Sequence, residues 1–265
     1  MQTRDVVRDA RCIRIAERHA RYVPDLERHF DLYFNAVVPH DEEGLAVVDY
    51  SEPRRHIYSL SKLPFLLSSL PEDEAMAEAY LRHFTGPWNL AFDVGAYCGL
   101  TSYVLSQRFT KVIAFEPDDE NWKCLVDNVE GHGMSNVTVV KMVMASDCNG
   151  RGFFGEGSLG SRLALGDFNV AGAKPLPSVD LAMACTISGV PDFIAMDIEA
   201  AEIEVLKASR ELLARERISL AIDTDHLMEG SRTTSNAVEA ILRSCGYTTQ
   251  TSEVSGSATT WAWKE

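Results

Sequence analysis

Short apolar runs alternate with helix-like stretches along the chain from Trp88 onward. Strands that alternate with helices are typical of a mostly parallel sheet with helices packed on its faces. Two last β-like runs are separated by a Ser/Gly turn, which indicates an antiparallel hairpin. The pattern predicts a Rossmann-like α/β fold. Its predicted strands are WNLAFDV, KVIAFE, VTVVKMVM, DFIAMD, RISLAID, GYTTQT and ATTWAWK.

Helical periodicity fills the intervals between these runs. It predicts a helix that ends near Phe109 and further helices at about 118–130, 201–214 and 233–245. A Gly-rich stretch at 151–177 interrupts the alternation and predicts a short hairpin with a mobile loop.

The part of the chain before this domain has a different pattern. Residues 3–35 predict one or two amphipathic helices, residues 44–60 a strand pair, and residues 72–84 a helix that ends before Gly86-Pro87. We therefore divide the chain into an N-terminal helical and β extension, residues 1–86, and an α/β domain, residues 87–265.

Composition narrows the classes of partner and compartment. The 265 residues carry a formal charge of −14, which argues against nucleic acid and anionic membranes as partners. The N-terminus is too charged for a secretory signal, and no run reaches the roughly 18 apolar residues of a membrane span. The six cysteines are scattered and do not have the spacing of a zinc site. We expect them to be free thiols in a reducing compartment. We expect a cytoplasmic protein with a small-molecule partner, and the sequence leaves a homo-oligomer open.

The segment FDVGAYCGLTS, residues 92–102, carries the first candidate chemistry. An apolar strand ends in Asp93, the chain turns on two glycines, and a helix follows. Such a turn brings backbone N–H groups and a positive helix end to a ligand, although a plain tight turn has the same pattern. The candidate cofactor contacts in this loop are Asp93, Gly95, Ala96, Gly99 and Ser102.

An acid at the end of the next strand makes the loop more specific. Glu116 ends KVIAFE, the position at which a doubly wound fold presents a carboxylate to ribose hydroxyls. Asp93 would repel a pyrophosphate but attract the ammonium and sulfonium charges of S-adenosylmethionine. A nicotinamide-dependent oxidoreductase is the alternative, but the only Tyr-x-x-x-Lys spacing, Tyr58 to Lys62, precedes the loop.

Three later strand ends supply further candidates. Ser146 and Asp147, after the third strand, can accept from an adenine amino group, or they form a turn. Asp197 ends the fourth strand, where we place the transferred methyl group, and Glu199 follows it. Glu202 and Glu204 lie where acids usually only interact favourably with the dipole at a helix N-terminus.

The fifth strand ends in acids and a histidine. Asp223, Asp225 and His226 follow one another closely there, and His226 is a candidate general base for an acceptor hydroxyl. A surface histidine is the alternative. Asp197, Asp223 and Asp225 are also an alternative set of ligands for a divalent cation.

Taken together, these motifs resemble the FkbM family of S-adenosylmethionine-dependent methyltransferases, from about Leu90 to Tyr247. The resemblance implies a seven-stranded class I methyltransferase fold that ends in an antiparallel hairpin, and methylation of hydroxyls on natural products and sugars. It also implies cofactor contacts at Asp93, Gly95, Gly99, Glu116 and Asp147. The chain departs from the family at Ala195, where Lys is frequent, at Ala200, where Gly is frequent, and at Tyr97, where a small polar residue is usual.

The sequence thus predicts an O-methyltransferase in which Asp197, Glu199 and His226 are the candidate catalytic residues. The Gly-rich stretch and the N-terminal extension are candidates for a lid and an acceptor pocket. Methylation of a carboxyl or nitrogen, and a nucleotide-binding module without catalysis, are the other functions left open.

Overall fold

The structure is a computed structural model, and it describes residues 37–39, 45–51, 54–59, 77–154, 162–163, 174–228, 232–254 and 257–265. Predictions for residues 3–35 and for most of the Gly-rich stretch lie outside these residues.

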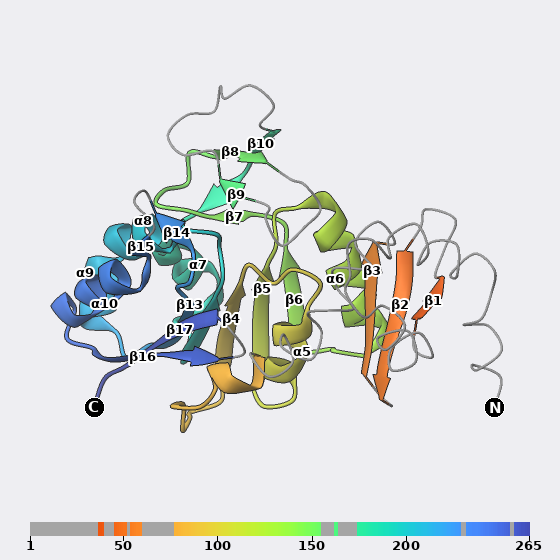
Figure 1. Ribbon diagram of the computed structural model, residues 1–265, viewed down its shortest axis with the longest axis horizontal. Helices are drawn as coiled ribbons and strands as arrows, with labels where there is room; N and C mark the ends of the chain where they lie inside the picture. Colours follow the sequence, from red (N-terminus) through yellow and green to blue (C-terminus); the bar gives the residue numbers. More distant parts are fainter. Residues whose placement is uncertain are drawn as a thin grey trace.

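A seven-stranded sheet forms the centre of the molecule (Figure 1). The strand order is β16-β17-β13-β12-β4-β5-β6. The five strands from β13 to β6 run parallel, while β16 and β17 are antiparallel and form the terminal hairpin. This architecture confirms the predicted fold class. The bounds are β4 Leu90–Val94, β5 Lys111–Phe115, β6 Val137–Val140, β12 Phe193–Met196, β13 Ser219–Asp223, β16 Thr248–Val254 and β17 Ser257–Trp263.

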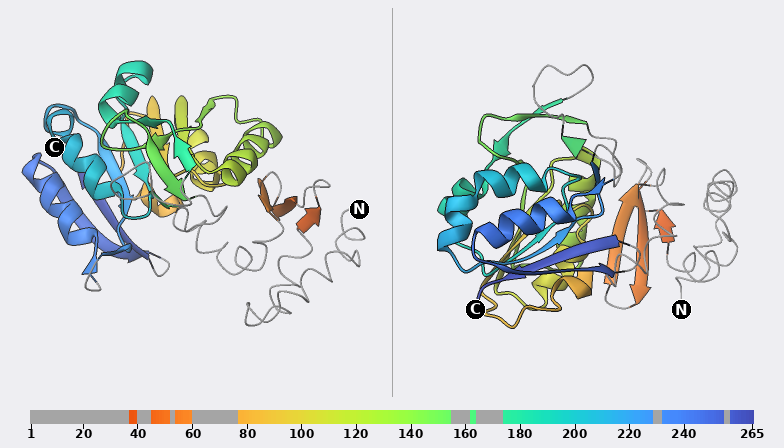
Figure 2. Two further views of the ribbon diagram at one scale, coloured as in Figure 1. Left: turned by 90° about the horizontal axis from the view of Figure 1, so that it is seen from above. Right: turned by 60° about the vertical axis from the view of Figure 1, so that its left-hand side comes forward.

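Helices cover both faces of the sheet because alternate strand residues are apolar on both sides (Figure 2). Phe92 and Val94 belong to a core cluster with α7, α8, α9 and α10, whereas Ala91 belongs to a second cluster with α5 and α6. The bounds are α5 Leu100–Ser106, α6 Asp119–Gly131, α7 Leu181–Ser188, α8 Glu202–Ala208, α9 Arg210–Arg215 and α10 Ser235–Ser244.

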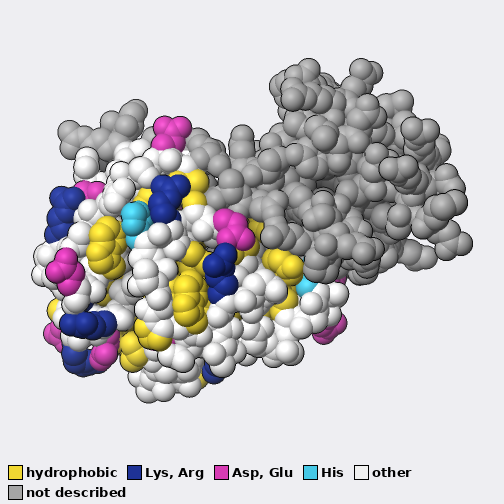
Figure 3. Space-filling model, turned by 90° about the horizontal axis from the view of Figure 1, so that it is seen from below, with side chains coloured by type: hydrophobic (Ala, Val, Ile, Leu, Met, Phe, Trp, Pro, Cys, Tyr) yellow, Lys and Arg dark blue, Asp and Glu magenta, His cyan; other side chains and the backbone are white. Residues whose placement is uncertain are grey.

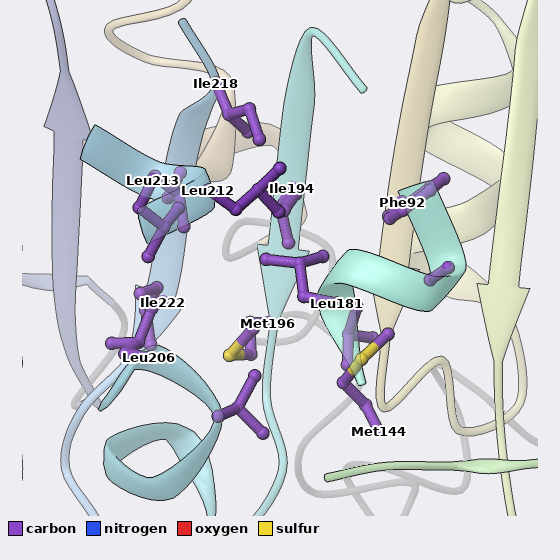
Figure 4. Packing of buried hydrophobic residues seen from close by; sticks show 14 of the residues in the cluster. Phe92, Met144, Leu181, Ile194, Met196, Leu206, Leu212, Leu213, Ile218 and Ile222 are labelled. Atoms are coloured by element: carbon purple, nitrogen blue, oxygen red, sulfur yellow. The ribbon is translucent and has the colours of Figure 1, made fainter. Parts of the chain in front are cut away.

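The first cluster fixes the middle of the sheet against α7, α8 and α9. Figure 4 shows Leu181 of α7 beside Ile194 and Met196 of β12, with Leu206 of α8 near Ile222. All five side chains are buried. Burial of each side chain stabilises the fold by roughly 1.5–3 kcal/mol, so this layer holds the ends of β12 and β13 in place.

The structure differs from the sequence prediction at three places. The run VTVVKMVM is not one strand, because β6 ends at Val140 and β7, Val143–Met144, pairs with β11, Ser178–Val179, in a separate sheet. The helix predicted over 201–214 is two helices that meet at Ser209. Helix α7 is absent from the sequence prediction because LAMACTIS is a short, mostly apolar run without clear helical periodicity.

The described part of the N-terminal extension contains an antiparallel sheet of β1 Val37–Pro39, β2 Leu45–Ser51 and β3 Arg54–Ser59. Pairing of β2 with β3 confirms the predicted strand pair, and β3 lies beside α6 (Figure 1). Residues 77–80 are helical and residues 81–83 form a turn, so the predicted helix ends earlier than Phe84.

The Gly-rich region contributes a small antiparallel sheet above the main one (Figure 1). It consists of β8 Arg151–Phe154, β9 Arg162–Leu163 and β10 Lys174–Leu176. A second short hairpin joins β14, Leu227–Met228, to β15, Arg232–Thr233, before α10.

One face of the described residues carries mixed charge (Figure 3). On the face seen in Figure 3, Lys and Arg side chains lie among acidic and single hydrophobic side chains. Within the same residues, none of the helices has the length and apolar character needed to cross a membrane.

Candidate functional site

The candidate site lies where the parallel strands of the sheet end. Asp93 is in β4, Glu116 follows β5, Asp197 follows β12 and Asp223 ends β13. The N–H of Asp197 donates to the carbonyl of Val94 over 2.9 Å, which ties two of these ends together. Crevices at this edge of a parallel sheet are the usual ligand sites of doubly wound folds.

The glycine loop between β4 and α5 is held from within the protein. The N–H groups of Gly95 and Ala96 both donate to the carbonyl of Phe115 over 3.0 Å, and that of Gly99 donates to Ala96 over 2.8 Å. These donors therefore shape the loop instead of facing a ligand as expected. Gly95 has a φ of +85° and Gly99 one of +96°, a region that favours glycine.

Asp93 is buried against α5. Its side chain is 3% exposed, and the Ser102 hydroxyl donates to Asp93 Oδ2 over 2.5 Å. Burial raises the pKa of Asp93 to about 7, which the Ser102 hydrogen bond opposes and the nearby charge of Asp197 reinforces. Ser102 is fully buried and supports Asp93, and its predicted contact with the cofactor stays a prediction.

Glu116 links the glycine loop to the turn before α6. The N–H of Tyr97 donates to Glu116 Oε2 over 2.8 Å, and the N–H of Asp118 donates to Oε1 over 2.9 Å. The side chain is only 4% exposed. Desolvation raises the pKa of Glu116 to about 8, although both N–H groups pull it down.

Ser146 and Asp147 follow a strand of a separate small sheet. They follow β7 and not β6, so they are not at the end of a central strand. Asp147 Oδ1 accepts from the N–H of Asn149 over 2.9 Å, and its carbonyl accepts from Ser178 over 2.8 Å. These bonds form the turn that is the alternative reading of this segment.

His226 is the centre of an acidic cluster. Its Nε2 lies 3.4 Å from Asp197 Oδ1, 3.7 Å from Glu199 Oε2 and 3.9 Å from Asp225 Oδ1. Its Nδ1 lies 3.2 Å from Glu202 Oε1. The histidine side chain is only 12% exposed. Both of its ring nitrogens therefore face carboxylates with little water around them.

This environment opposes the predicted role of His226 as a general base. Desolvation alone would lower the pKa of His226, but the carboxylates of Asp197 and Glu202 outweigh it and raise the pKa to about 12. An imidazolium with both nitrogens protonated has no lone pair with which to accept a proton.

Glu202 is a site residue that the sequence pattern hides. An acid in the first turn of a helix usually faces solvent, but Glu202 is 0% exposed and its Oε1 accepts from the N–H of Ile198 over 3.1 Å. Glu202 begins α8 and His226 follows β13, so the two residues are distant in sequence and only the fold brings them together.

The predicted cation ligands Asp197, Asp223 and Asp225 do not form one group. The ligand atoms within 4.8 Å of one another are those of Asp197, Glu199 and His226, and those of Asp223, Asp225 and His226. Asp223 is 5% exposed and accepts from the Ser257 hydroxyl on both oxygens, each over 2.9 Å. Asp223 is thereby held toward the β17 side.

Tyr80, in the helical residues 77–80, is buried and feels the charge of the site acids. Desolvation raises the pKa of its phenol well above the ordinary value, with further contributions from Asp197, Asp223, Asp93 and Asp225. Trp261 Nε1 donates to the carbonyl of Tyr80 over 3.1 Å and fixes that segment on the sheet. No sequence motif pointed to this tyrosine.

The three departures from the FkbM pattern all lie here. Tyr97 and Ala200 adopt φ values of +51° and +72°, and Glu199 one of +55°. Ala195 is buried in β12 and pairs in register with Asp93. A Cβ strains a left-handed backbone, so the glycine that the resemblance implies at position 200 would relieve strain there.

A mostly parallel seven-stranded sheet with a terminal antiparallel hairpin, and a glycine loop that meets an acid from the next strand, define a class I methyltransferase fold. The family model "Methyltransferase FkbM domain" matches residues 93–249. The chain belongs to this family, which confirms the resemblance.

Solved structures with this fold include two with a TM-score of 0.50. One is the methyltransferase FkbM from Methylobacillus flagellatus KT, with 18% identity, covering 77% of this chain and 54% of that one. The chain therefore spans about half the length of that relative. The other is M. jannaschii TYW2 in complex with AdoMet, with 14% identity, covering 85% of this chain and 88% of that one. None of the curated proteins compared with the chain matches it.

Proposed function

We propose that the protein transfers the methyl group of S-adenosylmethionine to a hydroxyl of a small acceptor. The observation that carries this proposal is the hydrogen bond from the N–H of Tyr97 to Glu116 Oε2, 2.8 Å long. It joins the loop after Asp93 to the acid at the end of the next strand, so one crevice offers a carboxylate to each end of an adenosyl amino acid.

The two buried acids divide the work of holding the cofactor. Asp93 attracts its α-ammonium group, while Glu116 accepts from the two ribose hydroxyls. A carboxylate has about four lone-pair positions, so Glu116 can accept from a ligand while it keeps its bonds to Tyr97 and Asp118. Membership of the FkbM family and the AdoMet in the TYW2 structure support this choice of cofactor.

The acceptor then lies on the Asp197 side of the crevice. Its oxygen attacks the methyl carbon, an O–C bond forms, the C–S bond breaks, and S-adenosylhomocysteine leaves. The hydroxyl proton passes to a carboxylate or to solvent. Because the sulfonium is already reactive, positioning and exclusion of water account for much of the rate.

The site favours a small acceptor from the cytoplasm. The chain carries a formal charge of −14, and Asp197, Glu199 and Asp225 gather at the acceptor side. A polyanionic partner such as nucleic acid would meet repulsion there. The N-terminal extension supplies part of the acceptor pocket in this proposal, and association into a homo-oligomer is compatible with it.

Calorimetry with S-adenosylhomocysteine tests the cofactor assignment. We expect binding by the intact protein, no binding of NAD, and a loss of about 10-fold or more in affinity for Glu116→Ala. Glu130→Ala removes an exposed acid of α6 and is the control. No uptake, or equal uptake by Glu116→Ala, refutes the proposal.

Methyl transfer is tested with labelled S-adenosylmethionine and acceptors that carry hydroxyl, carboxyl or amino groups. Mass spectrometry then locates the added methyl group. Transfer to oxygen of a hydroxyl supports the proposal, whereas transfer only to nitrogen or to a carboxyl replaces it with one of the alternatives. Cofactor binding without any product across the panel favours a binding module.

A further inference from the structure

We propose that Asp197, Glu199 and His226 bind a divalent metal ion and that Glu202 positions the histidine for it. The site is a property of the chain whether or not it transfers methyl groups. Its three ligands come from the loop after β12 and from the loop after β13.

The spacing of the ligand atoms suits one ion. His226 Nε2 lies 3.4 Å from Asp197 Oδ1 and 3.7 Å from Glu199 Oε2, and the three atoms all lie within 4.8 Å of one another. Two atoms bound at about 2.1 Å to the same ion are about 3.0 Å apart at a right angle and about 3.4 Å apart at the tetrahedral angle. The 3.4 Å from His226 Nε2 to Asp197 Oδ1 already has the tetrahedral spacing, and the 3.7 Å to Glu199 Oε2 is only slightly longer.

The balance of charge favours a cation. Carboxylates reach His226 from the loop after β12, from α8 and from the loop after β13. They belong to Asp197, Glu199, Glu202 and Asp225. Among the described residues, His226 is the only basic side chain within ion-pair distance of these four acids. A divalent ion displaces the proton from His226 Nε2, and its two charges neutralise more of this half-buried cluster than that one proton does.

Glu202 supplies an observation independent of the exposed acids. It is 0% exposed, its Oε2 has no hydrogen-bond partner among the described residues, and its Oε1 lies 3.2 Å from His226 Nδ1. A buried carboxylate on one ring nitrogen of a metal-binding histidine is the usual device that fixes the ring and directs the other nitrogen at the ion. Here that other nitrogen points to Asp197 and Glu199.

The donor set selects the kind of ion. One imidazole nitrogen with two carboxylate oxygens, and Asp225 3.9 Å from Nε2 as a further oxygen, suits Mn²⁺ better than a thiophilic ion. Asp197 is 42% exposed on its side chain, so coordination positions face the crevice. If the proposed function holds, an acceptor oxygen can take one of them, and the ion then favours its ionised form.

Titration of Mn²⁺ followed by electron paramagnetic resonance tests the site on the full chain. We expect one tightly bound ion per chain. Glu199→Gln keeps the size of a partly exposed side chain and removes a ligand, so it weakens Mn²⁺ binding by about 10-fold or more. Glu202→Gln keeps an acceptor for the N–H of Ile198 and weakens binding by about 10-fold.

Glu204→Gln is the matched control, because Glu204 is an exposed acid of the same helical turn. It leaves the Mn²⁺ affinity unchanged. Absence of bound Mn²⁺ at millimolar concentration, or equal affinities in Glu199→Gln and Glu204→Gln, overturns the site. Binding of S-adenosylhomocysteine is measured on the same samples. Its presence without Mn²⁺ binding rejects only the metal site, and the reverse result rejects only the proposed function.

Discussion

The α-carbon of Gly95 lies directly against the backbone carbonyl of Asp197. A Cβ at position 95 would overlap this oxygen, and the next nearest side-chain atom, Ile198 Cγ2, would be 3.2 Å away. The glycine loop and the end of β12 can therefore meet only without a side chain at this point. The same contact sets the distance between the proposed cofactor loop and the proposed acceptor side.

Gly95→Ala should separate these two segments. The overlap involves backbone, which cannot rotate away, and the φ of +85° adds strain. We expect a loss of about 3 kcal/mol in the free energy of unfolding and no measurable binding of S-adenosylhomocysteine. Denaturant unfolding and calorimetry measure the two effects.

Gly246→Ala is the control for backbone strain. Gly246 has nearly the same φ, +86°, but nothing lies within 4 Å of an added Cβ. This variant should lose only about 1 kcal/mol and bind the ligand normally. If both variants behave alike, close approach to Asp197 is not the reason for glycine at position 95.

Ala200→Gly should stabilise the protein. Ala200 has a φ of +72°, where an L side chain costs roughly 1–2 kcal/mol. Glycine removes this strain, but it also raises the conformational entropy of the unfolded chain, which offsets part of the gain. We expect a net rise of about 0.5–1 kcal/mol in the free energy of unfolding. Ala182→Gly, at an exposed position in α7, should instead lower it by about 1 kcal/mol. A fall in both variants contradicts the strain at Ala200.

The sheet and the cofactor loop could be predicted from the sequence because both depend on local pattern. Apolar runs separated by helical segments determine the strands, and Gly95 and Glu116 follow consecutive strands. The break in VTVVKMVM could not be predicted, since the N–H of Met142 turns back to the carbonyl of Val140 inside a mostly apolar run that continues past Lys141.

The acceptor side depended on contacts that no local pattern encodes. Glu202 has the sequence context of a solvent-facing acid, and only the packing of α8 buries it beside His226. Tyr80 precedes the strands of the main sheet in the chain, and Trp261 Nε1 donates to its carbonyl. The protonation of His226 follows from the number of carboxylates around it, which is a property of the fold.

Binding of S-adenosylhomocysteine should strengthen as pH rises. Burial, with Asp197 nearby, raises the pKa of Asp93 to about 7, and burial raises that of Glu116 to about 8. The ligand prefers both carboxylates ionised, so binding releases protons wherever they are protonated in the free protein. We expect at least about a 10-fold gain in affinity between about pH 6 and about pH 8. Calorimetry at several pH values measures it.

Asp93→Asn separates the two acids. It keeps an acceptor for the Ser102 hydroxyl but cannot ionise, so it should bind weakly at about pH 8 and show a shallower pH dependence, due to Glu116 alone. An unchanged slope would show that Asp93 does not titrate on binding.

Ser102→Ala should move this pH dependence upward. The Ser102 hydroxyl donates to Asp93 Oδ2 over 2.5 Å and lowers the pKa of that carboxyl against the effect of burial. Without this donor the pKa of Asp93 rises further, so affinity should fall at about pH 7 and recover at higher pH. The free energy of unfolding should drop by only about 1 kcal/mol. Ser106→Ala removes a hydroxyl of the same helix that donates to the carbonyl of Tyr103, and it should leave the pH profile in place. A profile that stays in place in Ser102→Ala as well would mean that Ser102 does not control the ionisation of Asp93.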